Sequence, residues 1–193
     1  MVKRLLFLLV VLSLCTTAFA HTGHETSGGF VSGLKHPLFG LDHMVAMIAV
    51  GIWAAAIGRR AIWLLPVVFP VVMTIGAIMA FSGLALPAVE AGIAASAIVI
   101  GVLLALALRA PLWLAAAVVG LFALFHGNAH GSEIPLGASA AGYCIGFVIA
   151  TAALHLAGIG IGLAARLPHG SLLARLVGGV TACLGAAFLL GWL

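Results

Sequence analysis

The chain has 193 residues, of which 65% are hydrophobic and only 6% are charged. A soluble domain carries roughly a quarter charged residues, because its surface must be hydrated. This composition excludes a water-soluble globular domain and predicts an all-α membrane protein whose outer surface is solvated by the lipid bilayer. The net charge of +4 is not gathered into a basic patch, so we expect no nucleic-acid partner.

Residues 1–20 have the pattern of a cleavable signal peptide. Lys3 and Arg4 form the charged start, an apolar stretch follows, and Ala18 and Ala20 form an A-x-A ending. The apolar stretch is short for a retained membrane span. Cleavage after Ala20 would place His21 at the mature N-terminus.

The rest of the chain predicts a periplasmic, His-containing leader at 21–36 and a transmembrane domain of six helices at 37–193. Each apolar segment is close to the ~20 residues that span a bilayer. We expect the helices at 37–58, 61–82, 87–108, 111–127, 137–165 and 170–192.

The basic residues of the domain occur in alternate loops and predict its orientation. Arg59 and Arg60 follow the first helix, Arg109 follows the third, and Arg166 and Arg175 flank the start of the sixth. The positive-inside rule assigns these loops to the cytoplasm. We therefore expect a multi-pass protein of the bacterial inner (cytoplasmic) membrane with both mature termini in the periplasm.

Glycines in the predicted fifth helix indicate close helix packing. Gly142 and Gly146, and then Gly158 and Gly162, are spaced four residues apart. Small residues at this spacing let helix backbones approach each other in a membrane.

The first candidate metal-binding segment opens the predicted first helix. Pro37 suits the first turn of a helix, which leaves His36 just before it. On a continuous helix His36, His43 and Met47 share one face, two turns separating the histidines. Asp42 either completes a site there or orients an imidazole.

The second segment follows the predicted fourth helix. If that helix continues, then His126, His130 and Glu133 lie on one face at i, i+4 and i+7. Two imidazoles at this spacing can share a metal ion. Gly127 and Gly131 leave a broken helix end as the alternative.

Three further histidines are auxiliary candidates. His21 and His24 could capture a metal at the mature N-terminus, although a disordered leader explains them equally well. His155 lies deep in the predicted fifth helix, where it is a transit ligand, a proton-coupled group or an interhelical hydrogen-bonding residue. Glu90 opens a helix, where a carboxylate interacts favourably with the helix dipole.

The combination of imidazoles and carboxylates on one side of the membrane favours a divalent transition metal over a hard ion such as calcium. The alternative is that the histidines cap helices or form interfacial hydrogen bonds. For the joint arrangement we favour the metal.

Both segments resemble the signature motifs of the HupE/UreJ proteins, and the resemblance extends over the mature chain. The matching residues are His36-Pro37-Leu38-x-Gly40-x-Asp42-His43 with Gly51, and His126-Gly127-x-Ala129-His130-Gly131-x-Glu133. The resemblance implies a nickel or cobalt permease that supplies hydrogenase or urease maturation. It also implies metal handling by His36, Asp42, His43, His126, His130 and Glu133.

We therefore expect a secondary transporter that takes up a divalent metal, nickel first and cobalt second, from periplasm to cytoplasm. No phosphate-binding glycine motif is present, so ATP hydrolysis is excluded. We expect no enzymatic activity and no prosthetic group. The alternatives are an intramembrane metal-dependent hydrolase and a metal-binding membrane protein without transport, and the sequence leaves open whether the chain forms a homo-oligomer.

Overall fold

The computed structural model describes residues 29–134, 139–165 and 170–193, and every regular element in these ranges is an α-helix. The predicted signal peptide, His21, His24 and Arg166 lie outside the described residues. The helices are α2 (Gly29–Phe39), α3 (Leu41–Ile57), α4 (Arg59–Phe81), α5 (Val89–Ala105), α6 (Leu112–Ser132), α7 (Ala140–Ala164) and α8 (Gly170–Leu189).

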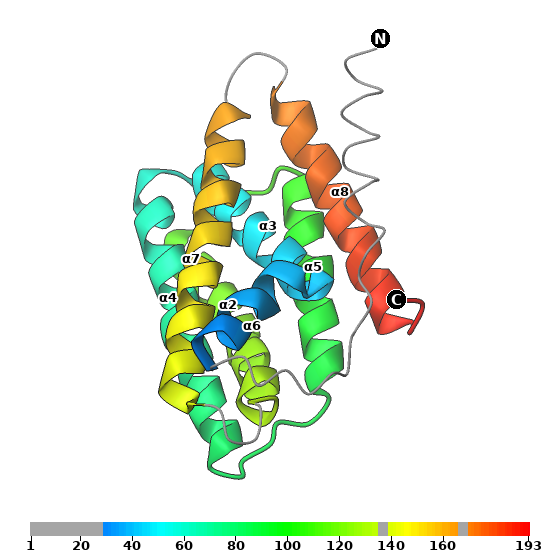
Figure 1. The fold of residues 1–193 in the computed structure, drawn as a ribbon. Helices are drawn as coiled ribbons and strands as arrows, with labels where there is room; N and C mark the ends of the chain where they lie inside the picture. Colours follow the sequence, from blue (N-terminus) through cyan, green and yellow to red (C-terminus); the bar gives the residue numbers. More distant parts are fainter. Residues whose placement is uncertain (1–28, 135–138, 166–169) are drawn as a thin grey trace.

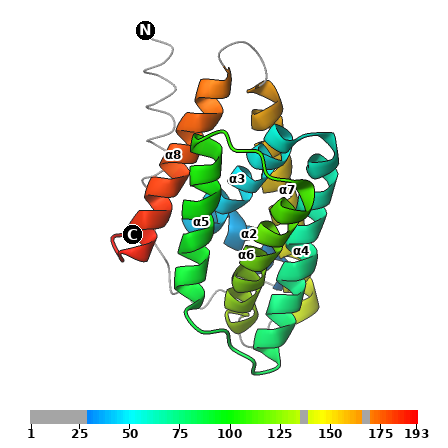
Figure 2. The same cartoon turned by 180° about the vertical axis from the view of Figure 1, so that it is seen from behind.

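The long helices stand upright beside one another, while α2 and α3 run obliquely among them (Figures 1 and 2). Helix α4 packs on α6, α5 packs on α8, and α7 packs on both α2 and α3. The buried hydrophobic residues lie between these pairs, chiefly on α3, α4 and α6.

The outer surface is apolar, as a lipid-facing surface must be. Along α4, large hydrophobic side chains are exposed on one face at Trp63, Val67, Val71, Ile75 and Ile78. Within the described residues α4, α6, α7 and α8 are long and apolar enough to cross a membrane, and the bent pair of α2 and α3 would be a fifth span. Helix α5 has 17 residues, at the lower limit for spanning a bilayer. The multi-pass membrane class is thus confirmed, and the sixth span stays a prediction.

The predicted first helix at 37–58 is wrong in its start and in its continuity. Helix α2 begins at Gly29, inside the expected leader, so Pro37 lies within α2 rather than at its first turn. Helix α3 begins at Leu41, and the axes of α2 and α3 differ in direction by 73°. The break is at Gly40, whose ψ of 109° is extended. Glycine is a poor helix former because an unfolded glycine loses so much conformational freedom on entering a helix.

The described arginines lie at one end of the bundle. Arg59 and Arg60 begin α4, Arg109 lies in the α5–α6 loop, and Arg175 donates from Nε to the carbonyl oxygen of Ala105 at 2.8 Å. These loops are at the top of Figure 1, and the α4–α5 loop is at the bottom. The alternation of loops between the two ends agrees with the prediction; which end is cytoplasmic stays a prediction.

The glycine pairs of α7 pack as the sequence predicts. A Cβ on Gly146 would overlap the carbonyl oxygen of Phe30 in α2, and a Cβ on Gly158 would overlap that of Ile48 in α3. Gly51 in turn lies against the carbonyl oxygen of His155. The absence of side chains therefore allows α7 to contact α2 and α3 backbone to backbone.

The α3–α7 contact predicts different effects on stability for alanine substitutions at two glycines of α7. Gly158→Ala should destabilise the protein by about 1–3 kcal/mol, because its methyl group has no space beside α3. Gly160→Ala is the matched control, since nothing lies within 4 Å of a Cβ there. Thermal unfolding in detergent measures both, and equal melting temperatures for the two variants would contradict the close contact.

Candidate metal centre

Three imidazoles from three helices converge into one cluster. His36 comes from the end of α2, His43 from the first turn of α3, and His130 from the last turn of α6. One ligand atom from each lies within 4.8 Å of the other two. Imidazole nitrogens at this separation form a candidate site for a transition-metal ion.

The bend at Gly40 is what joins His36 to His43. On a continuous helix the seven-residue spacing would separate them by roughly 10 Å along the axis. Their ring centroids are instead 5.8 Å apart, and the ring of His36 lies 4.7 Å from that of His130. The predicted stripe on one helix is therefore wrong, although the predicted residues do meet.

Gly40 also leaves room for these groups to approach the backbone. A Cβ at Gly40 would come within 3.1 Å of the carbonyl oxygen of His36 and 3.3 Å of Asp42 Oδ1. It would also come within 3.5 Å of His43 Nδ1. A larger residue would therefore crowd the centre as well as disfavour the bend.

Two carboxylates lie behind the imidazoles. Asp42 Oδ1 is 2.8 Å from His43 Nδ1, and Glu133 Oε2 is 3.2 Å from His130 Nδ1. Glu133 Oε2 also lies 3.4 Å from His36 Nε2. A carboxylate at one ring nitrogen orients a histidine and makes the opposite nitrogen a better metal ligand. The predicted orienting role of Asp42 fits this geometry.

The opposite nitrogens of His43 and His130 face each other. Their Nε2 atoms are 2.5 Å apart. If each ring donates Nδ1–H to its carboxylate, both Nε2 atoms carry lone pairs, and these repel unless a positive centre lies beside them. With these two tautomers, the cluster would have the electronic character of a cation site.

His126 lies next to this cluster but outside the set of three. Helix α6 continues to Ser132, beyond its predicted end at residue 127, so of the two alternatives left open for the second motif the continuous helix is the one observed. Gly127 and Gly131 do not break it, because each packs against a backbone carbonyl of α4. The ring of His126 is fully buried and perpendicular to that of His43, with centroids 4.6 Å apart.

The auxiliary candidates on the described helices lie deeper. Met47 is fully buried in the hydrophobic core, one turn beyond His43. His155 is also fully buried, and neither of its ring nitrogens has a hydrogen-bond partner among the described residues. The predicted interhelical hydrogen bond is therefore not observed there. Phe69 separates the inner histidines, with ring centroids 5.6 Å from His126 and 5.2 Å from His155.

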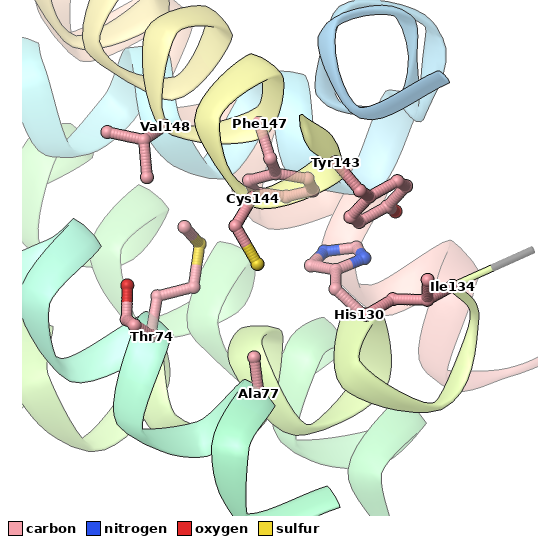
Figure 3. A pocket seen from close by; sticks show the side chains of 9 residues that line it. Thr74, Ala77, His130, Ile134, Tyr143, Cys144, Phe147 and Val148 are labelled. Carbon is pink, nitrogen blue, oxygen red and sulfur yellow. The ribbon is translucent and has the colours of Figure 1, made fainter. Parts of the chain in front are cut away.

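The aromatic ring of Phe147 covers the side of the histidine cluster that faces α7. The ring of Phe147 lies 4.3 Å from that of His130. Beyond it is a cavity of about 20 Å³ between α4 and α7, lined by Thr74, Cys144 and the edge of His130 among others (Figure 3). This volume is close to that of one water molecule. Sequence reasoning missed Phe147, because one phenylalanine in an apolar helix carries no distinguishing signal.

A larger cavity, of about 260 Å³, opens beside Asp42 and includes Glu90 at the start of α5. Glu90 is one of only three acidic residues beyond the leader, and the sequence predicts for it an interaction with the helix dipole; its position beside Asp42 in a cavity is not predicted. Burial raises the pKa of Glu133, and the negative charges of Glu90 and Asp42 raise it further. Three carboxylates thus give this end of the bundle an acidic surface that attracts cations.

The side chain of Asn128 on α6 forms hydrogen bonds to the α4–α5 loop and to α4. Its side-chain oxygen accepts from the amide of Leu86 at 2.9 Å, and its amide donates to the carbonyls of Leu84 at 3.0 Å and Gly76 at 3.3 Å. Asn128 lies inside the second motif between His126 and His130, and sequence reasoning assigned it no role. An asparagine in a buried helical segment was the available signal, because a buried amide needs partners.

Replacing Asn128 should loosen the loop. Asn128→Leu removes three hydrogen bonds, and each contributes about 0.5–1.5 kcal/mol. We expect the amide of Leu86 to exchange hydrogen at least ~10-fold faster. Ser82→Ala is the control, because the Ser82 hydroxyl donates only within its own turn, to Ile78. Unchanged exchange in Asn128→Leu would show that the loop is held by other contacts.

Two comparisons with known proteins find related sequences over most of the chain. The family model described as HupE / UreJ protein matches residues 9–188. Protein HupE from Rhizobium leguminosarum bv. viciae is 44% identical over 183 residues, which cover 95% of each chain. No solved structure matches the chain. The resemblance seen in the two motifs is confirmed.

Proposed function

Because this chain belongs to the HupE/UreJ family, we propose that it is a permease that carries a divalent transition-metal ion from the periplasm to the cytoplasm. The family is associated with nickel and cobalt uptake for hydrogenase and urease, so nickel is the first candidate and cobalt the second. The observation that carries the proposal is the convergence of His36, His43 and His130 within 4.8 Å.

Capture begins at the acidic end of the bundle. The cavity beside Asp42 and Glu90 concentrates hydrated cations by its negative charge. An ion that reaches the cluster exchanges water for imidazole nitrogens, while Asp42 and Glu133 keep the His43 and His130 rings oriented. Neutral imidazole suits nickel and cobalt better than it suits magnesium or calcium.

Inward transfer uses the buried histidines. His126 adjoins His43, and His155 follows across the ring of Phe69, in the C-terminal half of α7. Their positions describe a line of imidazoles from the acidic end into the bundle. Each transfer would exchange one nitrogen ligand for another, so the ion is never left bare in a low-dielectric interior.

The membrane potential is sufficient to drive such transport. A divalent cation moving inward gains about 4.6 kcal/mol per 100 mV, twice the value for one charge. No phosphate-binding motif is present to couple ATP hydrolysis. The ion would move down its electrochemical gradient, so the residues of the second motif and of α3 need only lower the free-energy barrier to its passage.

Loss of His43 tests the proposal directly. In proteoliposomes with an imposed inside-negative potential, His43→Ala should lower nickel uptake by more than ~10-fold. The reason is that the substitution removes one of the three imidazoles of the cluster and leaves only His36 and His130 as ligands. Cys183→Ser is the control, since Cys183 is an exposed residue of α8. Wild-type uptake in His43→Ala would reject the cluster as the transport site. Nickel binding without flux in the wild-type protein would favour the non-transporting alternative, and lipid turnover would favour the hydrolase.

His155 separates transport from capture. His155→Gln leaves the outer three histidines in place, so equilibrium nickel binding should stay close to that of the wild type while uptake falls severalfold. Isothermal titration and flux assays on the same preparation measure the two quantities. Equal uptake by both proteins would remove His155 from the path.

A further inference from the structure

Ser96 on α5 has a buried hydroxyl group that donates its proton to a backbone carbonyl of the same helix. It is 1% exposed, and its Oγ donates to the carbonyl oxygen of Ile93 at 2.6 Å. A hydroxyl group has one proton and two lone pairs. Any further partner of Ser96 must therefore be a hydrogen-bond donor.

That partner is the imidazole of His126. Its Nε2 lies 2.9 Å from Ser96 Oγ, in a buried contact between α6 and α5. With the Ser96 proton donated to Ile93, the serine oxygen accepts from the imidazole, and His126 Nε2 is then the nitrogen that carries the proton. A neutral imidazole has only one ring proton, so His126 Nδ1 is left as a lone pair.

This lone pair has no partner in the described part of the protein. His126 Nδ1 is a buried nitrogen without a hydrogen bond, on a ring with no solvent exposure. Burying an unpaired polar atom is unfavourable, so such an atom needs an explanation. The adjacent ring is that of His43, perpendicular to His126 at 4.6 Å.

We propose that Ser96 is a positioning residue that fixes the Nε2–H tautomer of His126 and thereby offers Nδ1 as the first inner ligand for the ion held by His36, His43 and His130. The inference rests on the proposed permease function. It adds a serine with no place in either motif, and it assigns the ligating atom of His126. Without the serine the two tautomers would exchange, and in one of them Nδ1 would carry a proton and could not bind a metal.

The tautomer can be observed without any transport assay. In protein labelled with ¹⁵N-histidine, the nitrogen resonances of His126, assigned by their loss in His126→Gln, should show a protonated Nε2 and an unprotonated Nδ1. Ser96→Thr keeps the hydroxyl and should keep this pattern, whereas Ser96→Ala should give mixed tautomers. A protonated Nδ1 in the wild-type protein would overturn the inference, even if Ser96→Ala fails to fold.

Uptake then links the tautomer to function. Ser96→Ala should lower the nickel uptake rate by about 10-fold, with Ser96→Thr restoring it, while nickel affinity at the outer cluster changes little. Thr181→Val is the control, because this buried hydroxyl on α8 also donates to a carbonyl of its own helix, that of Val177. Equal uptake in Ser96→Ala and the wild type would overturn the inference. Absence of uptake in the wild type would instead reject the permease proposal and leave the tautomer measurement to test Ser96.

Discussion

The interruption of the helix at Gly40 is the constraint on which the three-histidine cluster depends. It turns the chain by 73° between α2 and α3, so His36 and His43 both meet His130 of α6. A regular helix through this segment would hold the two histidines about 10 Å apart. A backbone irregularity in a membrane protein is tolerated where it is buried or lines a polar cavity. Here it is bordered by imidazoles and carboxylates, which suits that rule.

The carboxylates and the imidazoles have separate tasks. Asp42 and Glu133 contact the Nδ1 atoms of His43 and His130, and the opposite nitrogens of these rings face each other. Ser96 contacts His126 at the other ring nitrogen, Nε2, with a neutral oxygen. Orientation by an anion increases the basicity of a ligand, whereas orientation by a hydroxyl does so less strongly. If the outer cluster binds an ion as proposed, it should hold the ion more firmly than His126 does. Inward movement of the ion would then need the membrane potential as its driving force.

Much of the fold and of the centre could be predicted from the sequence, because composition and motif spacing report directly on membrane helices and on ligand chemistry. Helices α4, α5, α7 and α8 agree closely with the predicted ranges, whereas α6 extends beyond its predicted end at residue 127 to Ser132. His36, His43 and His130 do converge. The bend could not be predicted, since one glycine in an apolar segment is compatible with a continuous helix. The contacts of Asn128 and Ser96 were missed because their partners are 30 or more residues away, and no local pattern encodes such contacts. The position of Glu90 beside Asp42 in one cavity was missed for the same reason.

The glycine contacts have a mechanical consequence. Because α7 meets α2 and α3 through bare backbone, and α6 meets α4 in the same way at Gly127 and Gly131, each set should move as a rigid unit. The centre straddles the seam between these units, with His36 and His43 on one and His130 on the other. Rocking of one unit against the other would pull the chelating nitrogens apart without unfolding a helix. The affinity of the cluster for an ion would thus depend on the relative position of the two helix units.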